Sequence, residues 1–245
     1  MNMLFALLHK ARVVVLSMSQ VWYPAAGDHV NPETPSDTYD RRTIIADTAM
    51  KSAMRGNPKG FEQEEQEAQI SKFHPIDALA LILTIERSES GLDYFVHAGE
   101  ESHLGTQDSG RARCLGQVQT WEGNTLLTKE EHESLSGVDY DSTLRCANAI
   151  HEYLWYHAVR CRVRVKGRRF SKWVNHHRMS DYEAQRLMAY YAKGTCTPRF
   201  ASKAERQNLS KRSALFREIR TALEAKDLPE MPERPVDTKR VASTL

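Results

Sequence analysis

Residues 75–91 read PIDALALILTIERSESG, and this stretch decides the fold class. Pro75 suits the first turn of a helix because its ring fixes φ near the helical value. The next ten residues, IDALALILTI, are apolar on most sides, which is typical of a helix buried inside a core. Gly91 can supply the left-handed residue that ends such a helix. The sequence therefore predicts a buried central helix from Pro75 to about residue 90.

Further helices are predicted from periodicity and from caps. Residues 142–160 repeat apolar side chains on one face, which indicates a second core helix. Two capping boxes, in which a Ser and the Glu three residues later bond reciprocally to free backbone N–H groups, begin helices at Ser180 and Ser202. A further helix, SALFREIRTALEA, ends near residue 226. These signals predict a mostly α fold.

The chain of 245 residues has room for one domain with tails. Residues 1–40 are expected to be a flexible or targeting segment, 41–70 an N-terminal helical extension, 71–226 the domain, and 227–245 a disordered tail. The two apolar runs before residue 20 are interrupted by His9, Lys10 and Arg12, so an export signal is left open. A start of the working chain at Met18 is the alternative.

Charge is distributed unevenly along a chain whose net charge is only +2. Residues 160–220 hold 17 Lys and Arg against 4 Asp and Glu. This basic segment suits an anionic envelope polymer or a nucleic acid, or it is simply a solvated helical surface. Nucleic acid is the weaker reading because the aromatic residues lack the spacing of a base-stacking motif. No apolar run approaches the roughly 18 residues that span a bilayer.

The four cysteines, Cys114, Cys146, Cys161 and Cys196, lie close together in the chain and form no CxxC pair. This spacing argues against a zinc ribbon and against a thioredoxin-like site. An even number confined to one segment suits two disulfides in an oxidising compartment, and the alternative is four buried thiols. Three pairings are compatible with the sequence, which does not choose among them.

Glu89 is the candidate catalytic residue. A carboxyl group at the C-terminal end of a buried helix meets the negative end of the helix dipole and is poorly hydrated, and both effects favour its protonated form. Such a group can act as the general acid that cleaves a glycosidic bond. Glu86, one turn earlier, is the local competitor.

Three motifs carry a resemblance to a known family. Ser88-Glu89-Ser90-Gly91, then Cys114-Leu115-Gly116-Gln117, then Tyr191-Ala192-Lys193-Gly194-Thr195-Cys196, resemble in order and spacing the ESG, GLMQ and AYNAG motifs of the soluble lytic transglycosylases. These enzymes have the goose-type lysozyme-like fold. The match is closest to a cysteine-bearing branch, and it covers about residues 75–200. It implies a lysozyme-like single domain that cleaves the β-1,4 bond between N-acetylmuramic acid and N-acetylglucosamine.

The resemblance also implies roles for individual residues. Glu89 would be the single acid and base, and the product would be a 1,6-anhydro sugar. Ser90 would orient the substrate or the carboxyl group, Gln117 would line the glycan cleft, and Tyr191 would place its hydroxyl near Glu89, with Tyr190 as the alternative register. The sequence departs from the pattern at Gly116, Ala192 and Lys193. Gly116 stands where Met is usual and is expected to loosen one wall of the cleft.

Other readings remain open at this stage. If one of the loop carboxylates Asp93, Glu100, Glu101 or Asp108 held a water opposite Glu89, the reaction would be hydrolysis by a muramidase. A non-catalytic envelope or phage protein with a degenerate glycan-binding cleft is the alternative outside enzymes. No ligand spacing for a metal and no cofactor motif occurs in the sequence. The expected partner is peptidoglycan, and the expected location is the cell envelope, periplasmic or extracellular, or a phage particle.

Overall fold

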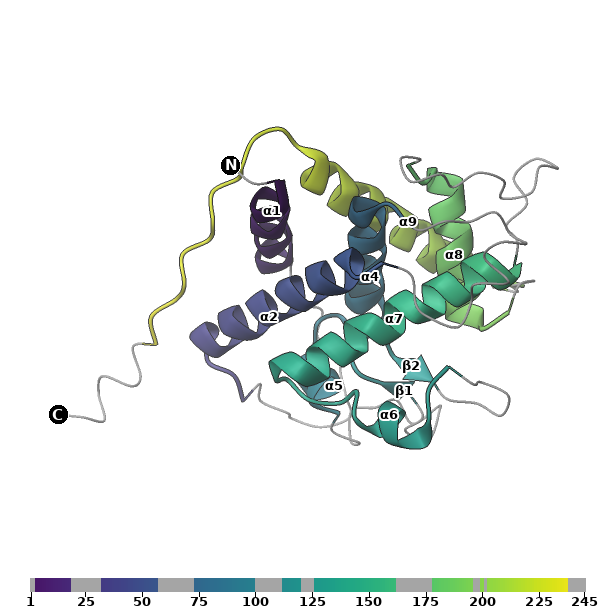
Figure 1. The fold of residues 1–245 in the computed structure, drawn as a ribbon, viewed down its shortest axis with the longest axis horizontal. Coiled ribbons are helices and arrows are strands. Elements are labelled where there is room, and N and C mark those ends of the chain that lie inside the picture. The colour runs from purple at the N-terminus through teal and green to yellow at the C-terminus, as the bar shows by residue number, and fades with distance from the viewer. Residues whose placement is uncertain are drawn as a thin grey trace.

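The computed structural model describes residues 3–18, 32–56, 73–99, 112–119, 126–161, 178–195, 199–200 and 202–237. Within them the protein is mostly helical, as the sequence predicts (Figure 1). The helices are α1 (Met3–Ser17), α2 (Pro35–Met54), α4 (Pro75–Ser90), α5 (Tyr94–Ala98), α6 (Lys129–Glu133), α7 (Tyr140–Cys161), α8 (Asp181–Lys193) and α9 (Lys203–Glu224), and the strands are β1 (Ala112–Arg113) and β2 (Val118–Gln119). The expected lysozyme-like arrangement of these helices stays a prediction.

Helix α4 is the centre of the core, and α2, α7, α8 and α9 all contact it (Figure 1). Its ten residues from Asp77 to Glu86 are all buried, on every side of the helix. Gly91 ends the helix in the left-handed conformation with φ 66°, as predicted. The predicted 75–90 helix is therefore confirmed at both ends.

An ion pair with a buried carboxylate fixes the first turn of α4 to the segment before α8. Arg178 donates from Nε and Nη2 to the two carboxylate oxygens of Asp77 at 3.1 and 2.8 Å. The Met179 backbone N–H donates to the same carboxylate at 2.8 Å, and Asp77 has no exposed surface. Arg178, one of the cations of the basic segment 160–220, thus forms an ion pair within the fold.

Both predicted capping boxes are present, at Ser180 with Glu183 and at Ser202 with Glu205. The second one opens a single helix of 22 residues, α9, where the sequence suggested two consecutive helices. Continuity is favoured because Phe216, Ile219 and Leu223 place one buried stripe against the core, so the helix is stabilised along its length.

The N-terminal part differs from the expected flexible segment over residues 1–40. Residues 3–17 form helix α1, which lies against α2 and α9 and buries Ala11 and Val15. Helix α2 begins at Pro35, inside the segment expected to be flexible, and it ends at Met54. Among the helices that the structure describes, none combines the length and the apolar character needed to cross a membrane.

The C-terminal segment also differs from the expected disordered tail at 227–245. Residues 227–237 have no regular secondary structure but bond to α1 and α2 at several points. The hydroxyl of Tyr39 donates to the Pro232 carbonyl at 3.1 Å, and Arg234 makes a two-pronged ion pair with Asp40. The Asp237 carboxylate accepts from the Ser36 backbone N–H at 3.3 Å. These bonds order a proline-rich segment that has no core of its own.

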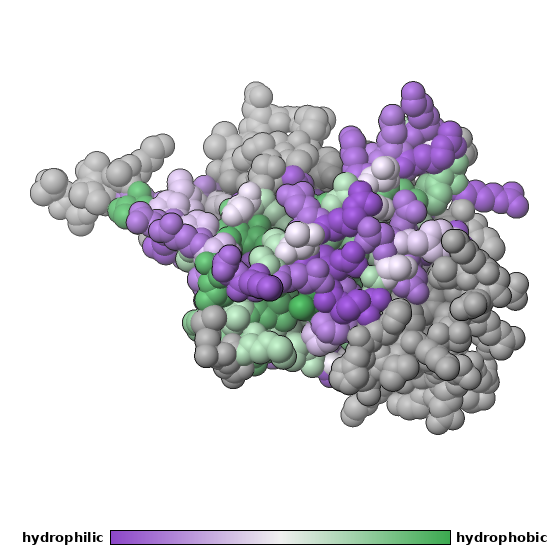
Figure 2. Space-filling view, turned by 90° about the horizontal axis from the view of Figure 1, so that it is seen from above, coloured by the Kyte–Doolittle hydropathy of each residue, from purple (hydrophilic) through white to green (hydrophobic). Residues whose placement is uncertain are grey.

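Hydrophobic residues gather in one area of the face seen from above, between hydrophilic ones (Figure 2). At the N-terminal end of α1, Met3, Leu4 and Phe5 have exposed fractions of 83%, 47% and 59%. The first turn of α1 is thus apolar and exposed, whereas later turns of the same helix contribute to the core.

Candidate active site

Glu89 lies in the last turn of α4, and 19% of its side chain is exposed. Burial raises the pKa of its carboxyl group above the ordinary value, while the nearby Arg212 guanidinium acts in the opposite direction. The net direction is upward. Glu89 therefore combines the two properties expected of a general acid, poor hydration and access to a cavity.

Arg212 contacts Glu89 directly. Its Nη1 atom donates to Oε1 of Glu89 at 2.5 Å, and 18% of the Arg212 side chain is exposed. Arg212 belongs to α9 and lies 123 residues from Glu89 in the chain. No motif marks it in the sequence, and sequence reasoning missed it.

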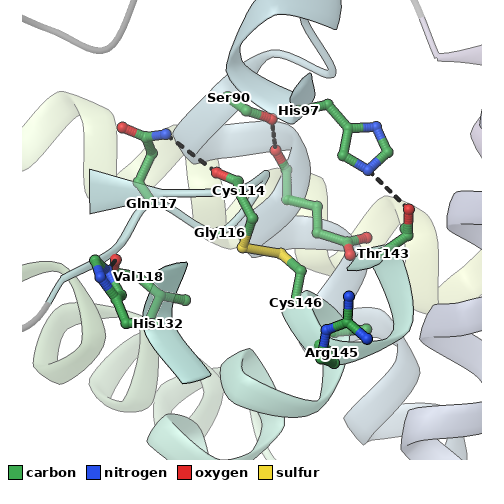
Figure 3. Close-up of a disulfide and its surroundings, with 12 residues drawn as sticks. Ser90, His97, Cys114, Gly116, Gln117, Val118, His132, Thr143, Arg145 and Cys146 are labelled. Carbon is green, nitrogen blue, oxygen red and sulfur yellow. Dashed lines mark hydrogen bonds between the residues drawn. A yellow bond between two sulfur atoms is a disulfide. The ribbon is translucent and has the colours of Figure 1, made fainter. Parts of the chain in front are cut away.

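The Gln117 motif forms a hairpin beside α7. Strands β1 and β2 are antiparallel, with Arg113 opposite Val118, and the Cys114–Cys146 disulfide joins their turn to α7 (Figure 3). The structure thus selects one of the pairings left open by the sequence. Cys161 carries no free thiol, and Cys196 lies outside the described residues.

The turn of this hairpin has an unusual backbone. Cys114 and Gln117 have positive φ values of 58° and 47°, a region that side-chain-bearing residues rarely adopt. The Gln117 side-chain amide donates back to the Cys114 carbonyl at 3.1 Å (Figure 3). On the other side of the hairpin, Nε2 of His132 lies 2.9 Å from the Val118 carbonyl oxygen. Such strained residues persist only where their surroundings fix them, and here a disulfide and side chains do so.

Gly116 does not loosen the cleft wall, contrary to expectation. A Cβ atom at this position would lie 2.5 Å from Cγ1 of Ile150 and 2.9 Å from the Tyr191 hydroxyl oxygen. Both separations are shorter than a carbon atom tolerates. Gly116 instead allows the hairpin backbone to approach α7 and α8 closely.

Tyr191 contacts the hairpin at Gly116, where the backbone comes close to α8. Its hydroxyl donates to the Gly116 carbonyl at 2.8 Å, which joins α8 to the hairpin. Its ring meets that of Tyr153 from α7 edge to face, with centroids 6.3 Å apart. Burial raises the pKa of Tyr191 well above the ordinary value, and the Glu89 carboxylate adds to the effect. Tyr191 therefore stays protonated close to Glu89.

These residues line one cavity of about 470 Å³. Its lining includes Glu89 from α4, Gln117 from the hairpin and Tyr191 from α8. Three motifs separated by more than 20 residues in the chain thus meet at one place. The complete lining is Glu89, Gln117, Val118, Tyr153, Tyr191, Ala192, Lys193 and Gly194.

Other predicted site residues lie elsewhere. The hydroxyl of Ser90 donates to the Glu86 carbonyl at 2.5 Å and accepts from the Leu92 N–H, so it serves the helix end and does not line the cavity. Tyr190 is buried but does not line the cavity, and its hydroxyl accepts from Arg186 at 2.7 Å. Of the two tyrosine registers, only Tyr191 faces the cavity.

Glu86, the local competitor of Glu89, has no exposed surface and does not line the cavity. Among the described residues its two carboxyl oxygens find no hydrogen-bond partner, and burial raises its pKa well above the ordinary value. A proton on Glu86 has no route to a bound glycan in this arrangement.

The loop carboxylates offer no second catalytic group within the described residues. Asp93 caps α5 by accepting from the N–H groups of Phe95 and Val96. Glu100, Glu101 and Asp108 lie outside the described residues. In that same described part of the chain, His, Cys, Asp and Glu side chains form no cluster that could hold a metal ion.

No protein-family model matches the chain, and no curated protein or solved structure matches it either.

Proposed function

We propose that this chain is a peptidoglycan lytic transglycosylase that cleaves the β-1,4 bond between N-acetylmuramic acid and N-acetylglucosamine. One observation carries the proposal: Glu89, Gln117 and Tyr191, which belong to the three motifs of the family resemblance, line a single cavity. Chance matches in unrelated helices would have no reason to converge. The resemblance itself is confined to about half of the chain.

In the proposed first step, Glu89 transfers its proton to the glycosidic oxygen. The bond from this oxygen to the anomeric carbon of the muramic acid breaks, and N-acetylglucosamine leaves with the proton. Burial, which favours the protonated carboxyl group, supports this role. The positive charge that develops on the sugar can be met by the carboxylate that remains and by the substrate's own N-acetyl group.

In the proposed second step, the Glu89 carboxylate accepts the proton of the 6-hydroxyl group while that oxygen bonds to the anomeric carbon. The product is a 1,6-anhydro sugar, no water is consumed, and Glu89 returns to its starting state. Gln117 presents polar atoms to the glycan, and Tyr191 remains a neutral neighbour of Glu89.

The cavity lining favours this reaction over hydrolysis. Glu89 is the one carboxylate among the described residues that line the cavity, whereas an inverting hydrolase needs a second one to activate water. Non-catalytic glycan binding is a second candidate, favoured by the Arg212 ion pair because it opposes protonation of Glu89.

The proposed substrate would place the protein in the cell envelope, periplasmic or extracellular, or on a phage particle. The Cys114–Cys146 disulfide supports an oxidising compartment. The basic segment 160–220 would help to hold the protein on an anionic polymer. Part of its charge is already used in internal pairs such as Arg178 with Asp77.

The test is digestion of purified peptidoglycan by the wild type and by Glu89→Gln, with mass spectrometry of the products. The wild type should release anhydro-muramyl ends, and the variant should lose at least about 100-fold in rate, as expected for removal of a general acid. Glu130→Gln, an exposed change on α6, is the matched control and should retain full activity. Reducing ends would favour the muramidase, and binding without release would favour the non-catalytic candidate.

A further inference from the structure

Glu89, which lines the cavity of the proposed site, forms a largely buried ion pair with Arg212. Their nearest atoms are 2.5 Å apart, and less than a fifth of either side chain is exposed. A carboxyl group that carries a proton gains much less from a guanidinium than a carboxylate does. The pair therefore favours the ionised form of Glu89 and opposes the effect of burial, and the ionised form cannot donate the proton of the proposed first step.

Arg212 also lines a second cavity of about 160 Å³. This cavity shares Ala192 and Lys193 with the cavity of Glu89, so the two adjoin. Its remaining described lining comes from α9 and the segment before it, namely Phe200, Glu205, Asn208 and Leu209. Arg212 thus lies at the boundary, with Glu89 on one side and an open space on the other.

The second cavity would attract an anion once Arg212 left Glu89. Lys193 and Arg212 are both cationic, and Glu205 is the one carboxylate in the described lining. Lys193 is paired with Glu205 at 2.5 Å. If Arg212 turned from Glu89 into this space, its charge would be uncompensated. A carboxylate of the ligand could then pair with it in the two-pronged geometry that guanidinium groups prefer.

We propose that Arg212 is a substrate-sensing positioning residue: it pairs with Glu89 in the free protein and moves to a carboxylate of the stem peptide when a peptide-bearing glycan binds. The inference rests on the proposed function and deepens it, because it makes peptide-bearing strands the preferred substrate. N-acetylmuramic acid carries its peptide on the lactyl group, close to the bond that is cleaved. Burial already outweighs Arg212, and release of Arg212 removes the opposing charge, so the Glu89 carboxyl group takes up its proton more readily.

No other ionisable group among the described residues in the lining can replace Arg212. From α8, Tyr191 is a neutral neighbour and Lys193 is held by Glu205. From α7, burial raises the pKa of Tyr153, so it is neutral too. The hairpin contributes the uncharged Gln117 and Val118. Arg212 is therefore the group whose position can switch the charge state of Glu89.

The first part of the test compares two soluble tetrasaccharides of alternating N-acetylglucosamine and N-acetylmuramic acid, one with stem peptides and one without. The wild type should cleave the peptide-bearing one about 10-fold to 100-fold faster, the range for one charge-assisted hydrogen bond. Arg212→Gln should lose this preference, and Arg212→Lys should restore part of it. Lys211→Gln removes a neighbouring exposed charge on α9 and should change nothing.

The second part follows rate against pH for the peptide-bearing substrate. The dependence of kcat/KM reports the free protein, so loss of Arg212 should move its basic limb to higher pH. The dependence of kcat reports the complex, where Arg212 has already left Glu89, so its limb should stay in place. A purely structural role for Arg212 would not separate the two profiles.

The outcomes are distinct. Equal cleavage of both substrates by the wild type, or equal movement of both limbs in Arg212→Gln, would overturn the sensing role while leaving glycan cleavage intact. If the wild type cleaves neither substrate, the proposed function is wrong and the sensing role falls with it. A lost preference in a folded Arg212→Gln, with partial rescue by Arg212→Lys, would support the proposal.

Discussion

Replacing Glu86 by Gln should make the protein more stable at neutral pH. Glu86 is fully buried, and among the described residues no hydrogen bond reaches its carboxyl oxygens. Desolvation raises its pKa well above the ordinary value, so the native state keeps the proton that the unfolded chain releases. Its stabilising contribution is therefore complete below the unfolded pKa, about 4.3, and declines as pH rises towards the folded value.

The contribution of Glu86 to the free energy of unfolding declines by at most about 1.4 kcal/mol per pH unit, and so by at most about 2.7 kcal/mol between pH 5 and pH 7. Gln has the same shape and no charge at either pH. Urea unfolding should thus give similar free energies of unfolding for the wild type and Glu86→Gln at pH 5. At pH 7 the variant should have the larger free energy of unfolding. A difference that does not change with pH would refute this reasoning. The proposed glycan cleavage should persist in Glu86→Gln, because Glu86 does not line the cavity.

Three further changes test other parts of the structure. Cys114→Ala with Cys146→Ala opens a loop of 32 residues, so urea unfolding should show a loss of about 3.7 kcal/mol. Gly116→Met, which introduces the residue usual in the family that the motifs resemble, should lower the melting temperature because Ile150 occupies the space. Asp77→Asn breaks a buried ion pair and should lower the free energy of unfolding by about 2 to 3 kcal/mol, a value reduced because Arg178 is partly exposed.

Local signals in the sequence were sufficient for the helices that they mark. Pro75 and Gly91 bound α4, and the serines at 180 and 202 begin α8 and α9, because a cap acts within one turn of the chain. Helix α1 escaped prediction for a physical reason. The basic residues that interrupt its apolar pattern have distant partners, since Arg12 pairs with Asp47 on α2 and Lys10 bonds to carbonyl groups at the end of α9.

The candidate site, like the helices, could be predicted from the sequence only where a local motif marks it. Motifs pointed to Glu89, Gln117 and Tyr191, and the folded chain brings them to one cavity. Arg212 could not be found in this way, because no local pattern links a residue of α9 to the end of α4. The Ser90 hydroxyl is bonded within the helix end for a local reason, since a Ser at this position readily bonds to the carbonyl four residues earlier.

The charge state of Glu89 is thus controlled by two elements that act in opposite directions. Helix α4 buries the carboxyl group and favours its proton, while α9 supplies the cation that favours its loss. The position of α9 depends on the buried stripe that contains Phe216 and Ile219, one and two turns beyond Arg212. A cavity-forming change such as Phe216→Ala should therefore disturb the ion pair as well as stability, because a core responds to lost volume by shifting its helices. Under the proposed function, the packing of α9 against the core would therefore help to set the charge state of the proposed acid.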